Sequence, residues 1–390
     1  MNEQTLLITD EQAVGPAPQT QTRPFSFTGS ESEYFRIWIV NLFLTIVTLG
    51  LYSPWAKVRK KQYFYGHTWL DGCNFEYHGN PHAILKGRIL AALAFVAYSA
   101  TDNFSPKLAE VLIIVILVVS PWIIVQSLAF NAANSSYRNL RFRFSANYSD
   151  ALKAIWPLPL ALLVVLFLPE VGPKEIEASP HALWIGLLPI VVYGLAWPYV
   201  VGAMKRLQAN HTSFATTRFA CDAPISEFYG IFCVGVIIAF FTIIILFITT
   251  SIFAYVAAGI TPAQAPTAQL LNILALVITL LVTGTVFICY TQSQATNLMF
   301  NHTSFASHGG FVSRLSALQL SKLYCGNLFA ILLSFGLAIP WAIVRTARYR
   351  IESLEVEVQG NLDGFVGDRA ESVGAAGEEI GDFFGIDVSI

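Results

Sequence analysis

Charged residues are scarce in this sequence. Asp, Glu, Lys and Arg make up only 12 % of its 390 residues, whereas 55 % are hydrophobic and the mean hydropathy is +0.57. Soluble domains carry roughly twice that share of charge. The formal net charge of −2 also lacks the basic excess that nucleic-acid binding requires. The composition therefore excludes a soluble globular protein, argues against a nucleic-acid partner, and predicts an integral membrane protein.

Recognisable sequence motifs for catalysis are missing as well. No H-E-x-x-H, Walker A or G-x-S-x-G pattern occurs. The centres of the apolar segments contain almost none of the ionisable groups that ion-coupled transporters keep there. The cysteines are scattered without a C-x-x-C pair, so we expect buried thiols rather than disulfides or metal ligands. They are Cys73, Cys221, Cys233, Cys289 and Cys325. We expect no enzyme activity, no cofactor and no metal.

What the sequence does contain is a repeat. Residues 54–79 comprise a Pro-aromatic pair, a polar run, a His-Thr step and a closing alternation, Phe75-x-Tyr77-x-Gly79. The hexapeptide Asn-His-Thr-Ser-Phe-Ala occurs at both 210–215 and 301–306. A shorter fifth copy runs from Pro340 to Gly360. Such internal repeats indicate that one structural unit is used several times. The unit starts at Pro54, Pro121, Pro198 and Cys289, and the step follows thirteen residues later at His67, Asn134, His211 and His302.

Six apolar segments are long enough to span a bilayer, which takes about 20 residues. They lie near 84–101, 108–130, 151–168, 181–203, 227–258 and 268–299. The connectors that contain the repeats also contain most of the Lys and Arg residues, so the positive-inside rule places these connectors in the cytoplasm.

Two further apolar segments, 34–52 and 323–344, flank this set and are copies of each other. If both crossed the membrane, the first and last repeat elements would lie opposite the others. The conflict disappears if both segments turn back near Gly50 and Gly336, covered by the six spans. We favour this re-entrant arrangement, and eight simple spans remain the alternative.

Alternating segments such as Phe25-x-Phe27-x-Gly29 predict short strands. Isolated hairpins are marginal in water, so we expect these strands to pair into a small cytoplasmic sheet. The predicted fold is an all-α polytopic helix bundle with internal repeats and short cytoplasmic β-strand connectors. We divide the chain into a disordered tail (1–22), a membrane domain of about five repeat modules (23–360), and an acidic, glycine-rich tail (361–390).

The N-terminal motifs resemble those of a known family. Phe25-x-Phe27-x-Gly29, the run from Thr48 to Arg59, and Phe75-x-Tyr77-x-Gly79 followed by Ile84-Leu85-Lys86-Gly87-Arg88 are similar to the YjgN family of bacterial inner-membrane proteins. The resemblance covers about residues 23–360. It implies a multi-pass protein of the bacterial cytoplasmic membrane, for which we expect cytoplasmic termini. The family has no known activity, so it implies no site residues.

The repeat histidines His67, His211 and His302 have two interpretations. Three imidazoles can form a zinc site, but a histidine followed by Thr or Ser can also cap a turn. The second copy has Asn134 at this position, which suits a hydrogen-bonding cap and is a poor metal ligand. We therefore favour capping.

A basic cluster lies at the predicted membrane boundary. Such groups attract anionic lipid headgroups by about 1 kcal/mol each, although the same charges also serve to control topology. The candidate headgroup contacts are Lys57, Arg59, Lys60, Lys61, Lys86 and Arg88.

Two functions fit these features. The first is transport or lipid handling, because the protein has an apolar interior and a basic inner rim, and internal symmetry is common in transporters. The second is a scaffold that presents its repeats to a protein partner on the cytoplasmic face. A lipid- or solute-lined cavity between the repeats would favour the first function, and a solid core with an exposed apolar patch would favour the second.

Overall fold

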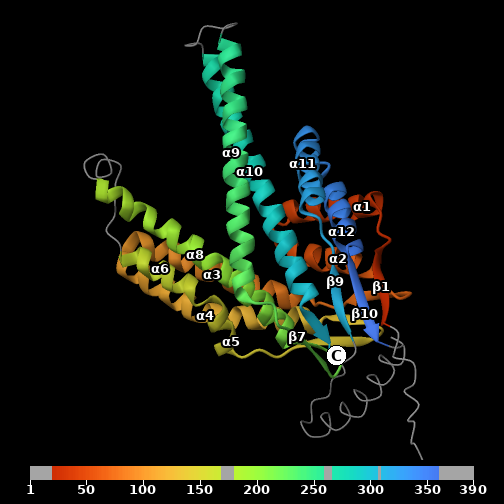
Figure 1. The fold of residues 1–390 in the computed structure, drawn as a ribbon. Helices are drawn as coiled ribbons and strands as arrows, with labels where there is room; N and C mark the ends of the chain where they lie inside the picture. The colour runs from red at the N-terminus through yellow and green to blue at the C-terminus, as the bar shows by residue number, and fades with distance from the viewer. Residues whose placement is uncertain (1–19, 168–179, 259–265, 306–308, 360–390) are drawn as a thin grey trace, which may run out of the picture.

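The computed structural model describes residues 20–167, 180–258, 266–305 and 309–359. The short strands pair into a closed antiparallel barrel of ten strands in the order β1-β10-β9-β8-β7-β6-β5-β4-β3-β2, and helices project from it (Figure 1). The strands are β1 (Thr20–Phe27), β2 (Thr68–Leu70), β3 (Cys73–Tyr77), β4 (Ser135–Tyr137), β5 (Leu140–Phe144), β6 (Thr212–Phe214), β7 (Thr217–Cys221), β8 (Thr303–Phe305), β9 (Gly309–Ser313) and β10 (Leu354–Gln359).

The all-α prediction is therefore wrong, although the strands pair with one another as expected. The first and last strands of the chain close the barrel, because β1 pairs with β10 through Thr22↔Glu357 and with β2 through Phe25↔Leu70. Each strand taken alone is too short to define a sheet. Closure gives every strand a partner on both sides and leaves no free edge, which makes strands of three to eight residues sufficient.

Tight turns connect the strands of two neighbouring hairpins. Asp71 and Gly72 have φ of 48° and 75°, and Arg138 and Asn139 have φ of 48° and 62°. Two consecutive positive φ values define the type I′ turn, whose twist matches that of the flanking strands. The sequences of these two repeats thus favour a β-hairpin locally.

The helices form hairpins between the strands. They are α1 (Glu31–Val47), α2 (Ser53–Gly66), α3 (Pro81–Phe104), α4 (Pro106–Ala133), α5 (Tyr148–Ile155), α6 (Pro157–Phe167), α8 (Pro180–His211), α9 (Ile225–Ala258), α10 (Pro266–Asn301), α11 (Ala317–Leu333) and α12 (Ile339–Glu352). Neighbouring hairpins pack side by side, and α1 contacts α12, so they form a ring above the barrel. In Figure 1 the pair α9 and α10 extends farthest from the strands.

The first and last helical hairpins turn where the sequence predicted. Leu49 and Gly50 have φ of 49° and 91°, and Phe335 and Gly336 have φ of 51° and 91°. Gly50 N–H donates to Thr45 O at 2.7 Å, and the equivalent Gly336 bond measures 2.9 Å. This is the bond pattern of a Schellman helix end, with Leu49 and Phe335 at the left-handed C′ position and the glycine one residue later. Both segments therefore run out and return to the barrel. Their insertion into a bilayer stays a prediction.

Five helices are long and apolar enough to cross a membrane, within the part of the chain that the structure describes. They are Pro81–Thr101, Lys107–Ala133, Trp184–His211, Ile225–Thr250 and Asn272–Asn301. The remaining predicted span, 151–168, is instead divided into α5 and α6 at Trp156. Residues 168–179 lie outside the described residues. The two predicted tails also lie there, except that Thr20–Thr22 already belong to β1.

An ion pair joins the first and last helical hairpins of the ring. Arg348 of α12 donates to Glu31 Oε1 at 3.1 Å and to the carbonyl oxygen of Gly29 at 2.9 Å. Glu31 opens α1, so the first and last repeat modules are held together by a charge-assisted contact as well as by the β1–β10 pairing.

Candidate functional site

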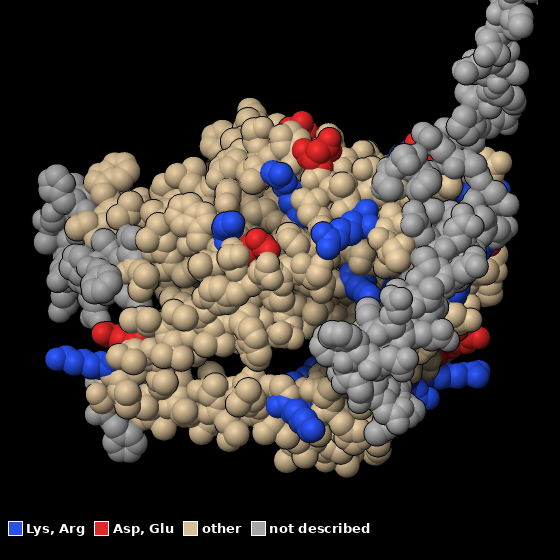
Figure 2. All heavy atoms as spheres, turned by 90° about the horizontal axis from the view of Figure 1, so that it is seen from below, with Lys and Arg blue, Asp and Glu red and all other residues tan. Residues whose placement is uncertain are grey.

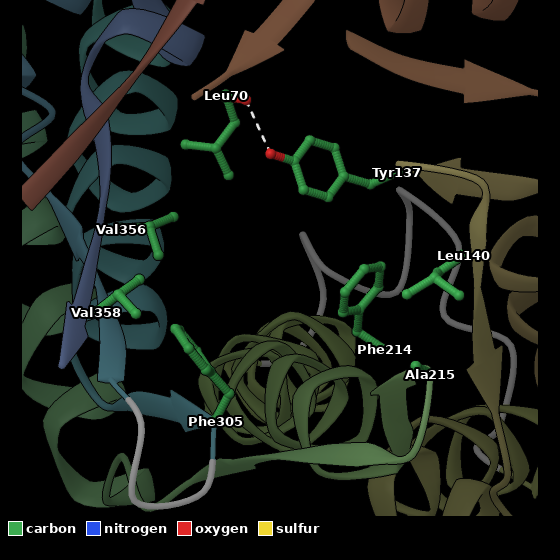
Figure 3. Packing of buried hydrophobic residues seen from close by; sticks show 8 residues of the cluster. All are labelled: Leu70, Tyr137, Leu140, Phe214, Ala215, Phe305, Val356 and Val358. Atoms are coloured by element: carbon green, nitrogen blue, oxygen red, sulfur yellow. Dashed lines mark hydrogen bonds between the residues drawn. The ribbon is translucent and has the colours of Figure 1, made fainter. Parts of the chain in front are cut away.

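The interior of the barrel is lined by aromatic rings. Along β5, Arg141 and Arg143 are exposed, whereas Phe142 packs against the buried core cluster of the barrel. This alternation places every second side chain inside the barrel. In Figure 3, Leu70, Tyr137, Phe214 and Phe305 point from different strands toward one common space.

The barrel surrounds a partly open cavity of about 450 Å³. Eight strands make an interior that side chains can just fill, so a barrel of ten strands is wide enough to leave space. Phenylalanine rings from neighbouring strands form most of its wall, among them Phe25, Phe75, Phe142, Phe214, Phe219 and Phe311. Its size falls within the range of about 300–1,000 Å³ that is usual for ligand sites.

The polar groups of the cavity wall are already engaged. Tyr137 donates to the carbonyl oxygen of Leu70 at 2.8 Å, drawn dashed in Figure 3, and burial raises the pKa of Tyr137 to about 12. Thr68 donates to the carbonyl oxygen of Phe64 at 2.8 Å, and the Tyr65 hydroxyl accepts from Ser135 at 3.4 Å. The cavity is thus suited to an apolar ligand, because a polar one would lose its hydrogen bonds to water.

A second cavity of about 690 Å³ lies among α2, α10, α11 and α12. It shares three wall residues, Tyr65, Thr68 and Ile351, with the barrel cavity, so the two spaces adjoin. Its lining is more polar, because Asn327 and Arg350 also contribute to it. The two cavities together form an apolar compartment with a polar region beside it.

The repeat histidines cap helices, as the sequence predicted. In each copy the repeat side chain donates a hydrogen bond to the carbonyl oxygen four residues earlier, in the last turn of the helix. At His67, Asn134 and His302 this carbonyl also accepts the backbone N–H of the same residue. The bonds are His67 Nδ1 to Tyr63 (2.8 Å), Asn134 Nδ2 to Phe130 (2.7 Å), His211 Nδ1 to Leu207 (3.1 Å), His302 Nδ1 to Leu298 (3.0 Å) and Ser353 Oγ to Tyr349 (2.6 Å). The described residues contain no group of three His, Cys, Asp or Glu that could hold a metal.

Replacing His211 with alanine is expected to lower the free energy of unfolding by about 0.5–1.5 kcal/mol, the usual net value of one hydrogen bond. Asparagine should retain most of that stability, because Asn134 makes the same cap in the second module. Thermal unfolding of the purified variants checks this. Equal losses in the two variants would contradict the cap.

Five of the six basic residues predicted to contact headgroups are exposed. Lys57, Arg59 and Lys60 are exposed on α2, and Lys86 and Arg88 are exposed at the start of the adjacent α3. Figure 2 shows lysine and arginine side chains scattered over one largely uncharged face of the molecule. The contacts of these exposed groups with lipid stay a prediction.

Lys61 differs from the rest of the predicted cluster. It is half-buried, its Nζ lies 2.5 Å from Asn131 Oδ1, and it lies 4.6 Å from the centre of the Tyr77 ring. Burial, and then the nearby charge of Lys57, lower the pKa of Lys61. Its amino group therefore belongs to the packing between α2 and α4 rather than to the exposed surface.

Sequence reasoning missed the cavity residues. The alternation in each strand pointed to an apolar face, but not to a cavity lined by the apolar faces of all the strands. Arg350 and Asn327, which line the second cavity, carry no motif that marks them as cavity residues in the sequence. For Arg350 the available signal was that the equivalent positions of the other copies are occupied by different residue types, namely Phe64, Asn131, Gln208 and Met299. Asn327 gave no such signal, because the first module has Asn41 at the equivalent position.

The chain matches a family described as "Bacterial protein of unknown function (DUF898)" over residues 22–383. It is 25% identical over 358 residues to the inner membrane protein YjgN of Salmonella typhimurium, covering 86% of this chain and 88% of that protein. It is 29% identical over 211 residues to the protein of the same name from Escherichia coli K12, where the match covers about half of each chain. No solved structure matches the chain.

Proposed function

This chain belongs to the DUF898 family of bacterial proteins of unknown function, and we propose that it is a multi-pass inner-membrane protein that handles lipid by holding an apolar chain inside its barrel. The membership confirms the resemblance to YjgN proteins found in the sequence. The names of the relatives and the five candidate spans support the location.

One observation supports the proposal above all. The aromatic cavity of the barrel adjoins a cavity among the helices through Tyr65, Thr68 and Ile351. A lipid tail between the helices would need to pass only this wall to reach the barrel. Compared with exposure to water on the cytoplasmic side, burial of an acyl chain there is favourable by about 0.8 kcal/mol for each CH₂ group.

The proposed orientation places the barrel in the cytoplasm. The lysines and arginines are concentrated in the connectors that form the strands, and the positive-inside rule supports a cytoplasmic location for these connectors. Both β1 and β10 belong to the barrel, so the two ends of the membrane domain would lie on the cytoplasmic side. A lipid tail held there would be shielded from water by protein.

We further propose that the chain binds lipid without chemical conversion. The repeat histidines support this, because their Nδ1 atoms are occupied as helix caps. The polar groups on the wall of the barrel cavity are likewise held by backbone or side-chain partners.

Native mass spectrometry of the gently extracted protein tests the proposal. We expect wild type to retain a stoichiometric lipid and Ile351→Trp to lose most of it, since the larger side chain fills the space at the shared wall. Ile351→Val, which opens that space slightly, should retain the lipid.

Phe329→Trp is the matched control for added bulk, because Phe329 is 65% exposed on the outside of α11. A clean protein mass for wild type, or lipid retention unchanged by Ile351→Trp, would overturn the proposal. If a second polypeptide accompanied that clean mass, the scaffold function would be favoured instead.

A further inference from the structure

Two basic side chains lie close together beside the helical cavity. Arg350 of α12 lines this cavity. Lys205 of α8 is close enough to Arg350 for the two positive charges to repel each other. Helix α10 holds both, because Arg350 donates to Gln292 Oε1 at 2.6 Å and Lys205 donates to Thr296 Oγ1 at 3.4 Å. Gln292 and Thr296 are four residues apart, so they share one face of α10 and draw the two cations to the same side.

Within the described part of the chain, the two cations have no negative partner. Neither forms an ion pair with any carboxylate of the described residues. Both are half-buried. Partly buried charges are normally paired, because leaving water is costly for an isolated ion. Two like charges held together by neutral oxygens therefore form a site that favours an anion.

Arg350 also keeps an unused donor. Its Nε is buried and has no hydrogen-bond partner among the described residues, while its Nη2 is fixed by Gln292. An unpaired buried donor is unfavourable. A guanidinium presents its N–H groups in a planar fork that matches the oxygens of phosphate and carboxylate.

The position of this pair relates it to the apolar compartment. Arg350 immediately precedes Ile351, which lines both cavities. Leu354, the first residue of β10, follows about one helical turn later. An anionic group bound to Arg350 would thus lie beside the wall shared by the two cavities, where an acyl chain would enter the barrel.

We propose that Arg350 and Lys205 bind the anionic head of the amphiphile whose apolar chain occupies the barrel. This inference rests on the proposed function, and it adds the charge of the ligand. The shared chemistry is an acyl chain ending in a phosphate or a carboxylate, so a phospholipid and a free fatty acid are the two sources to distinguish.

The test compares charged and uncharged lipids on the full chain after delipidation. The probes are dioleoyl phosphatidylglycerol against dioleoyl phosphatidylcholine, and oleate against oleyl alcohol, each titrated by native mass spectrometry. We expect wild type to favour the anionic member of one pair by about tenfold or more, since two basic groups contribute. The pair that shows this preference identifies the source as phospholipid or fatty acid.

The double variant Arg350→Gln, Lys205→Gln should lose this preference and still bind phosphatidylcholine or oleyl alcohol. The conservative variant Arg350→Lys, Lys205→Arg should keep part of it, which separates loss of charge from loss of fold. Arg141→Gln, Arg143→Gln is the matched control, because it removes the same charge from exposed positions on the barrel exterior.

Equal binding of charged and uncharged lipids by wild type would overturn this inference alone, and so would an unchanged preference in the Arg350, Lys205 double variant. An equal effect of the Arg141, Arg143 control would do so as well, since it would indicate general surface attraction. Absence of any lipid binding by wild type would instead overturn the proposed function on which this inference rests.

Discussion

Replacing Gly309 with alanine is expected to open the barrel. Gly309 lies in β9 opposite Val358 of β10 and has a φ of +156°. A Cβ atom at this position would lie 1.8 Å from the carbonyl oxygen of Glu357 and 3.0 Å from the Phe305 ring. The carbonyl belongs to the paired backbone and cannot turn away, so β9 and β10 would have to separate.

We expect Gly309→Ala to lower the free energy of unfolding by about 3–5 kcal/mol, combining backbone strain with overpacking. Little folded protein should then be recovered from membranes, and what remains should unfold at a lower temperature in detergent. Gly310→Ala is the control, because its Cβ would meet only the Thr303 carbonyl at 3.3 Å and no positive φ is required. Similar melting of the two variants would show that β9 and β10 are not paired in this register.

Replacing Phe27 with alanine is expected to weaken the strand that closes the barrel. Phe27 ends β1 and is only 6% exposed. Its ring stacks on Phe64 with centroids 5.8 Å apart. It also lies over Gly29, where an added Cβ would lie 2.5 Å from the ring. This packing explains the glycine of the Phe-x-Phe-x-Gly motif, because only a residue without a side chain leaves room for the ring.

Truncating a buried phenylalanine to alanine costs about 3–5 kcal/mol, and we expect Phe27→Ala to fall in this range. Thermal unfolding measures the loss, and protease cleavage within residues 20–27 would report whether β1 has left the barrel. Phe329→Ala makes the same chemical change at a side chain that is 65% exposed on α11. If the two variants lost equal stability, the closing strand would have no special role.

The sequence by itself determined the features that depend on local pattern. Composition was enough to identify a membrane protein, because charge is costly in a bilayer wherever it lies along the chain. The turns at Gly50 and Gly336 and the helix caps at His67 and His211 were predicted because each uses a residue within one or two helical turns. The strand at 75–79 was likewise visible from its alternation, and β3 ends at Tyr77.

Only the tertiary structure decided how the strands and helices of the separate repeats assemble into one closed barrel and one ring of helices. The all-α class was wrong because β1 and β10, more than 300 residues apart in the sequence, pair to complete a ring that no single repeat reveals. The cavity exists because ten strands enclose more space than their inward side chains fill. The nearness of Arg350 and Lys205 likewise arises where α8 and α12 meet one face of α10. Strand alternation indicates which side chains share a face, but the number of strands around a barrel and the helices that converge above it are set by contacts between distant repeats.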